Sequence, residues 1–138
     1  MSSYALSLLL AVIACVIGGT LGGRALARPQ AALGLAVGDD GAPTLLTEGR
    51  AFGGLLIFSH AGAALYLGYQ PSIGAAMAFA LAIGWFGAGL GQVASLLIDR
   101  THGRLNLSHL LFEVLIGVTL CLPFFNPGRL VLRGGYLA

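Results

Sequence analysis

Four long runs of apolar residues make up most of this chain, and they limit what it can fold into. The runs cover residues 4–23, 51–69, 73–98 and 107–122. A helix needs about 20 consecutive apolar residues to cross the hydrocarbon core of a bilayer. The chain of 138 residues is 57% hydrophobic and 9% charged, whereas soluble domains contain roughly 25% charged residues. We therefore predict a single all-α domain over residues 1–138, an integral membrane four-helix bundle.

The predicted links are short, except for a longer one between the first and second helices. Pro71 and Ser72 favour a start of the third helix directly after the second. Ser108 or Asn106 can cap the start of the fourth helix. Pro123 is predicted to end that helix, because proline cannot continue the hydrogen-bond ladder.

Residues 1–14 contain no lysine or arginine, so the charged start of a signal peptide is absent and we expect the first run to be a mature membrane helix.

The arginines predict the orientation in the membrane. Cytoplasmic links carry an excess of basic residues. We therefore expect a bacterial inner membrane protein with both termini outside the cytoplasm. The first and third links hold five arginines and the carboxyl-terminal tail holds two: Arg24, Arg28, Arg50, Arg100 and Arg104 against Arg129 and Arg133.

Polar residues gather at the predicted cytoplasmic side. Glu113 lies about two turns into the fourth helix, and Gln92 reaches a similar depth because it precedes Asp99 by roughly 10 Å of helix. A carboxylate inside hydrocarbon costs at least about 2.5 kcal/mol, so we expect Arg50 or Arg100 to pair with Glu113. A structural ion pair, a ligand site and a proton-handling site all remain open. The predicted polar intramembrane cluster comprises Glu48, Arg50, Gln92, Asp99, Arg100 and Glu113.

His60 falls near the middle of the second run. It is interpreted either as a neutral histidine bonded to a backbone carbonyl one turn away, as a proton relay, or as a haem or chlorophyll ligand. Bis-histidine ligation is not predicted, because no second histidine lies in another run. We expect no cofactor.

Small residues line one face of several predicted helices. Such faces let helix backbones approach closely in membranes, where lipid supplies no hydrophobic drive for association. The glycines predicted to pack between helices are Gly18, Gly22, Gly53, Gly54, Gly84, Gly87 and Gly91.

Other classes of function lack a supporting pattern in this sequence. The formal net charge of +2 is too small for a nucleic-acid partner, which needs a clustered basic face. The glycine-rich stretch 87–91 lies inside a membrane span without a preceding strand, so it does not predict a nucleotide site. Asp39 and Asp40 alone make a weak calcium signal, and we expect no metal site.

Three segments together resemble a known family. They are Thr47-Glu48-Gly49-Arg50-Ala51-Phe52-Gly53-Gly54, then Gly89-Leu90-Gly91-Gln92 leading to Leu97-Ile98-Asp99, then Phe112-Glu113-Val114-Leu115-Ile116-Gly117. This order is similar to that of the domain of unknown function 4345 family, short bacterial four-helix membrane proteins. The resemblance implies a bundle with a polar cluster and no assigned reaction. That family typically carries arginine where Gln92 stands, and a glutamine can still donate to the carboxylate of Glu113.

Two functions follow as hypotheses. The first is an accessory or structural subunit, not evidently an enzyme, that packs laterally in the bilayer against other membrane subunits or against itself. The alternative is a pocket protein, of enzyme or carrier type, that binds a lipid-like or anionic small molecule near Arg50, Gln92 and Glu113. The glycine-rich faces are compatible with tight packing and with space for a ligand.

Overall fold

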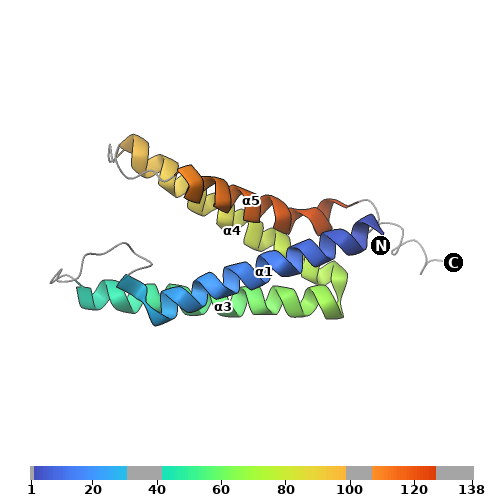
Figure 1. Cartoon of the computed structure of the whole chain (residues 1–138), viewed down its shortest axis with the longest axis horizontal. Coiled ribbons are helices and arrows are strands. Elements are labelled where there is room, and N and C mark those ends of the chain that lie inside the picture. Colours follow the sequence, from blue (N-terminus) through green and yellow to red (C-terminus); the bar gives the residue numbers. More distant parts are fainter. Residues whose placement is uncertain (1, 31–41, 99–106, 127–138) are drawn as a thin grey trace.

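The chain folds into an antiparallel arrangement of four long helices. The computed structural model describes residues 2–30, 42–98 and 107–126. Successive helices run in opposite directions, so Ser3, the Gln70 link and Phe125 lie at one end (Figure 1). The helices are α1 (Ser3–Ala27), α3 (Ala42–Tyr69), α4 (Pro71–Ile98) and α5 (Leu107–Phe125).

All four helices are long and apolar enough to cross a membrane. In each of them, a third or less of the most apolar window is buried within the chain. The remaining apolar surface suits contact with lipid, because lipid tails are as apolar as leucine. The predicted all-α membrane bundle is therefore confirmed.

Local chemistry explains where α1 begins and ends and where α4 begins. Ser2 caps α1, since its Oγ accepts a hydrogen bond from the backbone N–H of Ala5 at 3.2 Å. The helix stops at Ala27 because Arg28 precedes Pro29, and the residue before a proline is pushed away from helical geometry. Pro71 is the first residue of α4, as predicted.

Several helix boundaries differ from the prediction. The first helix continues past residue 23 to Ala27, so Arg24 lies inside α1. The second helix begins at Ala42, not near residue 51, so Glu48 and Arg50 lie inside α3. Apolarity marks the lipid-exposed part of a helix, whereas the helix itself continues while its backbone bonds can form. The expected stop at Pro123 is also wrong: α5 continues to Phe125 with Pro123 buried. A proline in the last turn removes one backbone hydrogen bond and leaves the remaining residues helical.

The predicted caps of the fourth helix are partly outside the described residues. The helix starts at Leu107, so Ser108 lies in its first turn. Asn106, the turn at residues 37–41 and the polar residues Asp99 and Arg100 lie outside the described part of the chain.

The helices are organised as two pairs. α1 packs mainly along α3, and α4 packs mainly along α5, with further contacts between α3 and α4 and between α1 and α5. The pairs meet at the end that carries Gln70 and diverge toward the opposite end (Figure 1). A core of small and apolar side chains holds the pairs together: Ala11, Ala14, Cys15, Ala63, Leu67, Ala78, Ala82, Ile116 and Leu120.

Candidate binding cleft between the helix pairs

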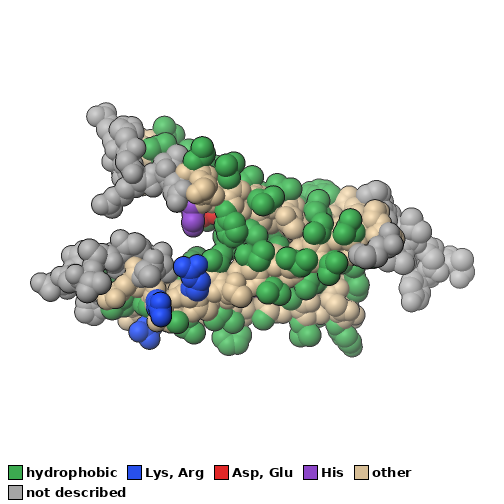
Figure 2. All heavy atoms as spheres, viewed as in Figure 1, with side chains coloured by type: hydrophobic (Ala, Val, Ile, Leu, Met, Phe, Trp, Pro, Cys, Tyr) green, Lys and Arg blue, Asp and Glu red, His purple; other side chains and the backbone are tan. Residues whose placement is uncertain are grey.

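A cleft of about 1260 Å³ lies between the two diverging helix pairs. In the space-filling view, basic side chains on the α1/α3 side face a histidine and an acidic side chain on the α4/α5 side across a hollow (Figure 2). The walls are otherwise largely apolar. Its charged and aromatic lining residues are Arg24, Arg28, Phe52, His60, Trp85, His109, Phe112 and Glu113.

Glu113 is the buried charged residue of this cleft. Its side chain is 5% exposed, and its Oε1 accepts a hydrogen bond from Gln92 Nε2 at 2.8 Å. His109 lies one turn earlier on α5 and is 60% exposed, with its Nδ1 at 3.4 Å from the same oxygen. The second oxygen, Oε2, is buried and has no hydrogen-bond partner in the described part of the chain. A buried carboxylate oxygen without a partner carries a desolvation cost that a bound donor would relieve.

Gln92 joins Glu113 to His109. Its Nε2 lies 3.0 Å from His109 Nδ1 as well as 2.8 Å from the carboxylate. A glutamine amide nitrogen only donates, so His109 Nδ1 is the acceptor in this arrangement. The three side chains form a chain of contacts from a buried carboxylate to an exposed imidazole.

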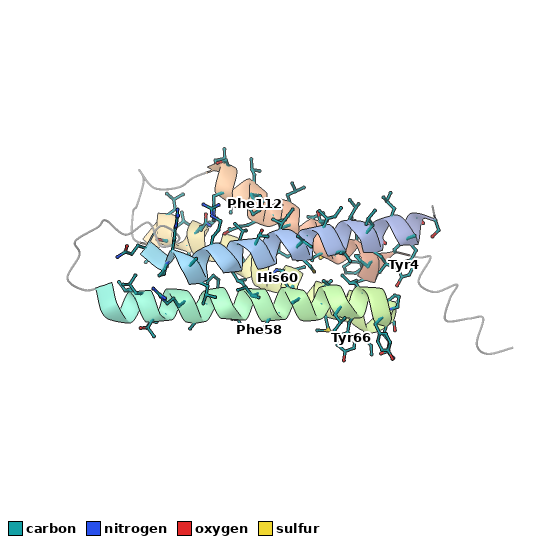
Figure 3. The ribbon with its side chains drawn as sticks, turned by 60° about the horizontal axis from the view of Figure 1, so that its bottom comes forward. Tyr4, Phe58, His60, Tyr66 and Phe112 are labelled. Carbon is teal, nitrogen blue, oxygen red and sulfur yellow. The ribbon has the colours of Figure 1, made fainter. Side chains whose placement is uncertain are left out.

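His60 and Trp85 form the inner end of the cleft. The imidazole is 1% exposed. Trp85 Nε1 donates to His60 Nε2 at 3.1 Å, and His60 Nδ1 lies 2.8 Å from the carbonyl oxygen of Leu56. Because an indole nitrogen only donates, Nε2 is the acceptor and Nδ1 carries the hydrogen that is donated to Leu56. His60 therefore has the geometry of a neutral histidine bonded one turn back, between the two helix pairs (Figure 3).

This geometry bears on the pigment hypothesis at His60. Both ring nitrogens are engaged, so a haem or chlorophyll would have to replace the bond from Trp85 or the bond to Leu56. No group of three or more metal-ligating side chains occurs among residues 2–30, 42–98 and 107–126.

Residues 5–123 match the model of a family described as "Domain of unknown function (DUF4345)". The chain belongs to the DUF4345 family. Comparisons with curated proteins and with solved structures found no match.

The segments that resemble the DUF4345 family converge at helix contacts in this member. Gln92 of the second segment donates to Glu113 of the third. Gly89 is buried, and a Cβ at this position would lie 3.5 Å from Glu113 Oε2. Gln92 thus holds the carboxylate of Glu113 across the contact between α4 and α5.

The predicted polar cluster is only partly assembled. The structure brings Gln92 and Glu113 together, whereas Glu48 and Arg50 are exposed on α3. Arg50, one of the two expected partners, does not pair with Glu113, because α3 and α5 belong to different helix pairs on opposite sides of the cleft. Among the described residues, the group at ion-pair distance from Glu113 is His109. Asp99 and Arg100 lie outside the described residues.

Sequence reasoning missed several cleft residues. Arg24 and Arg28 were assigned to a link, but both line the cleft from the end of α1. Arg24 lies in the last turn of α1 and Arg28 is its C-cap, with its backbone N–H bonded to the carbonyl oxygen of Arg24. On α5, the spacing of His109 and Glu113 places both on one helix face. Trp85 was also missed, since nothing in the sequence connects an indole on one helix to a histidine on another.

The glycines predicted to pack between helices divide into two groups. A Cβ at Gly22 would lie 2.7 Å from the carbonyl oxygen of Gly53, and one at Gly53 would lie 2.6 Å from the backbone nitrogen of Leu26. A Cβ at Gly18 would overlap the His60 ring. These three glycines permit close contact between α1 and α3.

For the other glycines the packing prediction is wrong within the described part of the chain. A Cβ at Gly54, Gly84, Gly87 or Gly91 would meet nothing within 4 Å. α4 instead packs through a different face, because its buried positions are Gly74, Ala75, Ala78, Ala82 and Gly89. Gly84 lines the cleft, so glycine there leaves space and does not bring two backbones together. We call Gly84, Gly87 and Gly91, which are all exposed, the α4 glycine face.

Proposed function

We propose that this DUF4345 protein binds an amphipathic molecule in the cleft between its helix pairs, within the bilayer. The observation that carries the proposal is Glu113, a buried carboxylate in the cleft wall whose Oε2 lacks a partner among the described residues. Intramembrane ionisable residues commonly mark functional sites. The Gln92 bond accounts for one oxygen only.

The composition of the cleft supports an amphipathic ligand. Most of its wall is apolar, with Leu55, Leu81 and Phe112 among the lining residues, while its charged side chains come from α1 and α5. Ligand sites typically combine a mostly apolar lining with a few placed polar groups. A molecule with a polar head and an apolar tail satisfies both parts of this lining.

The same proposal includes a membrane and an orientation, which the distribution of arginines along the chain supports. The protein resides in the bacterial inner membrane with the open end of the cleft on the cytoplasmic side. Arg24 and Arg28 lie at this end, where the excess of basic residues predicts the cytoplasmic face.

Native mass spectrometry of the protein released from its own membranes in mild detergent tests the binding. We expect the wild type to retain an adduct of lipid mass. Ala88→Leu, which places a larger side chain in the cleft, should remove the adduct. Gly87→Leu is the matched control, because Gly87 is the neighbouring exposed position and does not line the cleft. A bare wild-type chain, or an adduct unchanged in Ala88→Leu, would contradict the proposal.

A second proposed function is lateral assembly with another membrane subunit or with a second copy. The observation favouring it is that a Cβ at Gly87 or Gly91 would meet nothing within 4 Å, although exposed glycines on a membrane helix suit a helix partner. The same spectra test this, because Gly87→Leu should release the partner, whereas Ala88→Leu should leave the partner bound. A protein that is monomeric without any co-released subunit would exclude it.

A further inference from the structure

We propose that the cleft binds the headgroup of an aminophospholipid, with the phosphate at Arg24 and Arg28 and the primary ammonium at Glu113. This inference rests on the proposed function and specifies its ligand. It follows from two oppositely charged walls that face one cleft without pairing with each other.

The first wall supplies two arginines from the end of α1. Arg24 and Arg28 are one helical turn apart, both are exposed, and both line the cleft. Within the described part of the chain, the residues at ion-pair distance from one another are His109 and Glu113 alone, so neither arginine pairs with a described carboxylate. The guanidinium group presents a planar fork of donors that matches phosphate oxygens. Two such groups on one wall form a site for an anion.

The second wall supplies a buried hydrogen-bond acceptor, the carboxylate of Glu113. Glu113 is 5% exposed, its Oε1 is bonded to Gln92, and its Oε2 has no described partner. Glu113 lines the cleft, and the terminal torsion of a glutamate is soft, so a carboxylate oxygen can turn to meet a donor bound there. A primary ammonium has hydrogens to donate and the opposite charge. It satisfies the oxygen that the protein leaves open.

The size of the cleft favours a lipid over a small metabolite. Its volume of about 1260 Å³ exceeds the roughly 300–1,000 Å³ of typical small-molecule pockets. Apolar side chains from three helices, including Leu21, Leu56 and Leu81, also line it. An acyl chain can therefore remain in apolar surroundings while the headgroup reaches both walls.

The two walls together discriminate between headgroups. A lipid with an anionic phosphate and no amine satisfies the arginines but offers no cation to Glu113. Phosphatidylcholine has a cation, but its nitrogen carries methyl groups and no hydrogen to donate. An aminophospholipid such as phosphatidylethanolamine supplies both an anion and a donor.

Trp85 provides the measurement, because it is the chain's single tryptophan and lines the cleft. The full-length protein is reconstituted in phosphatidylcholine vesicles with increasing fractions of brominated phosphatidylethanolamine, phosphatidylglycerol or phosphatidylcholine of identical acyl chains. Bromine quenches indole fluorescence on contact, so quenching reports occupancy near Trp85. We expect the ethanolamine lipid to quench at a mole fraction about tenfold lower than the choline lipid, the factor expected for one charge-assisted hydrogen bond.

Two variants measure the contribution of each wall to lipid binding. Glu113→Gln removes the charge and keeps an acceptor for Gln92, and it should abolish the preference for ethanolamine over glycerol headgroups. Arg24→Gln combined with Arg28→Gln should weaken both phospholipids relative to wild type. Gly87→Ala is the control for handling and folding, since a Cβ there meets nothing within 4 Å. Circular dichroism and the unfolding temperature verify that each variant is folded.

The outcomes distinguish failure of the ligand assignment from failure of the proposed function. If ethanolamine and glycerol lipids quench equally in wild type and in Glu113→Gln, but both weaken in the double arginine variant, the cleft binds lipid and the aminophospholipid assignment is overturned. If all three lipids quench equally and no variant changes this, the contacts are those of surrounding lipid and the proposed function fails too. Selective quenching by the ethanolamine lipid that depends on Glu113 supports both.

Discussion

The seam between α1 and α3 and the α4 glycine face are both rich in glycine, yet they have opposite structures. At the seam, a Cβ on Gly22 would lie 2.7 Å from a backbone oxygen and 2.9 Å from a backbone nitrogen of α3. On the α4 glycine face, a Cβ would meet nothing within 4 Å. Glycine in a membrane helix therefore marks a surface without protruding side chains. Whether another backbone, a ligand or lipid covers that surface depends on where the helix lies.

The largest expected effect comes from filling the seam. Gly22→Ala should destabilise the protein by about 1–3 kcal/mol, the range for overpacking, because the nearest atoms include rigid backbone groups of Gly53 and Ile57. The measurement is thermal or denaturant unfolding in a fixed detergent. Gly87→Ala is the control and should stay within about ±0.5 kcal/mol. Equal losses in both variants would show that the seam and the α4 glycine face do not differ as described.

The next largest loss of stability is expected at His60, whose ring packs against Gly18. His60→Phe leaves Trp85 Nε1–H without its acceptor and should cost about 1–2 kcal/mol. The emission of the single tryptophan should shift to shorter wavelength, because its N–H loses a hydrogen bond in apolar surroundings. Ser59→Ala is the matched control, since its contact with the His60 ring is long, at 3.4 Å. Unchanged emission in His60→Phe would contradict the bond.

A smaller effect is expected where the cleft has polar walls. Gln92→Ala removes the donor to Glu113 Oε1 and should cost about 1 kcal/mol. Glu113→Gln should cost less, because the amide oxygen still accepts from Gln92. A double-mutant cycle between positions 92 and 113 should give a clear coupling energy, while a cycle between Arg50 and Glu113 should be additive. Coupling at Arg50 would show that the helix pairs approach each other more closely than in this structure.

The smallest effect on stability is expected at the cleft-lining member of the α4 glycine face. Gly84→Ala should leave the unfolding free energy within about ±0.5 kcal/mol, because there is open space at its Cβ. Gly53→Ala, at the seam, is the opposing variant, since its Cβ would lie 2.6 Å from a backbone nitrogen. Unfolding of the two variants under identical conditions measures the difference directly. A large loss in Gly84→Ala would mean that the cleft is closed by another part of the protein or by a partner.

Much of the fold followed from patterns along the chain. Apolar length located four helices, and Pro71 correctly located the start of α4. The boundary of α3 was missed because hydrophobicity reports contact with lipid, while helix formation near the membrane surface depends on backbone bonding. The Gln92–Glu113 part of the candidate site could be predicted in the same way. Both residues were singled out from their depth in the membrane, and they are bonded in the structure.

Four membrane helices, membership of the DUF4345 family and a carboxylate deep in the last helix are all evident from the amino-acid sequence. These properties depend on local composition, so they can be recognised without knowing how helices pair. The packing of the helices was needed to show that Arg50 lies away from Glu113, that His60 bonds to Trp85, and that Arg24 and Arg28 line a cleft opposite Glu113. The reason is physical: every helix here has apolar side chains around its circumference, so periodicity does not select a packing face. The pairing of the helices then determines which small residues are buried and which border open space.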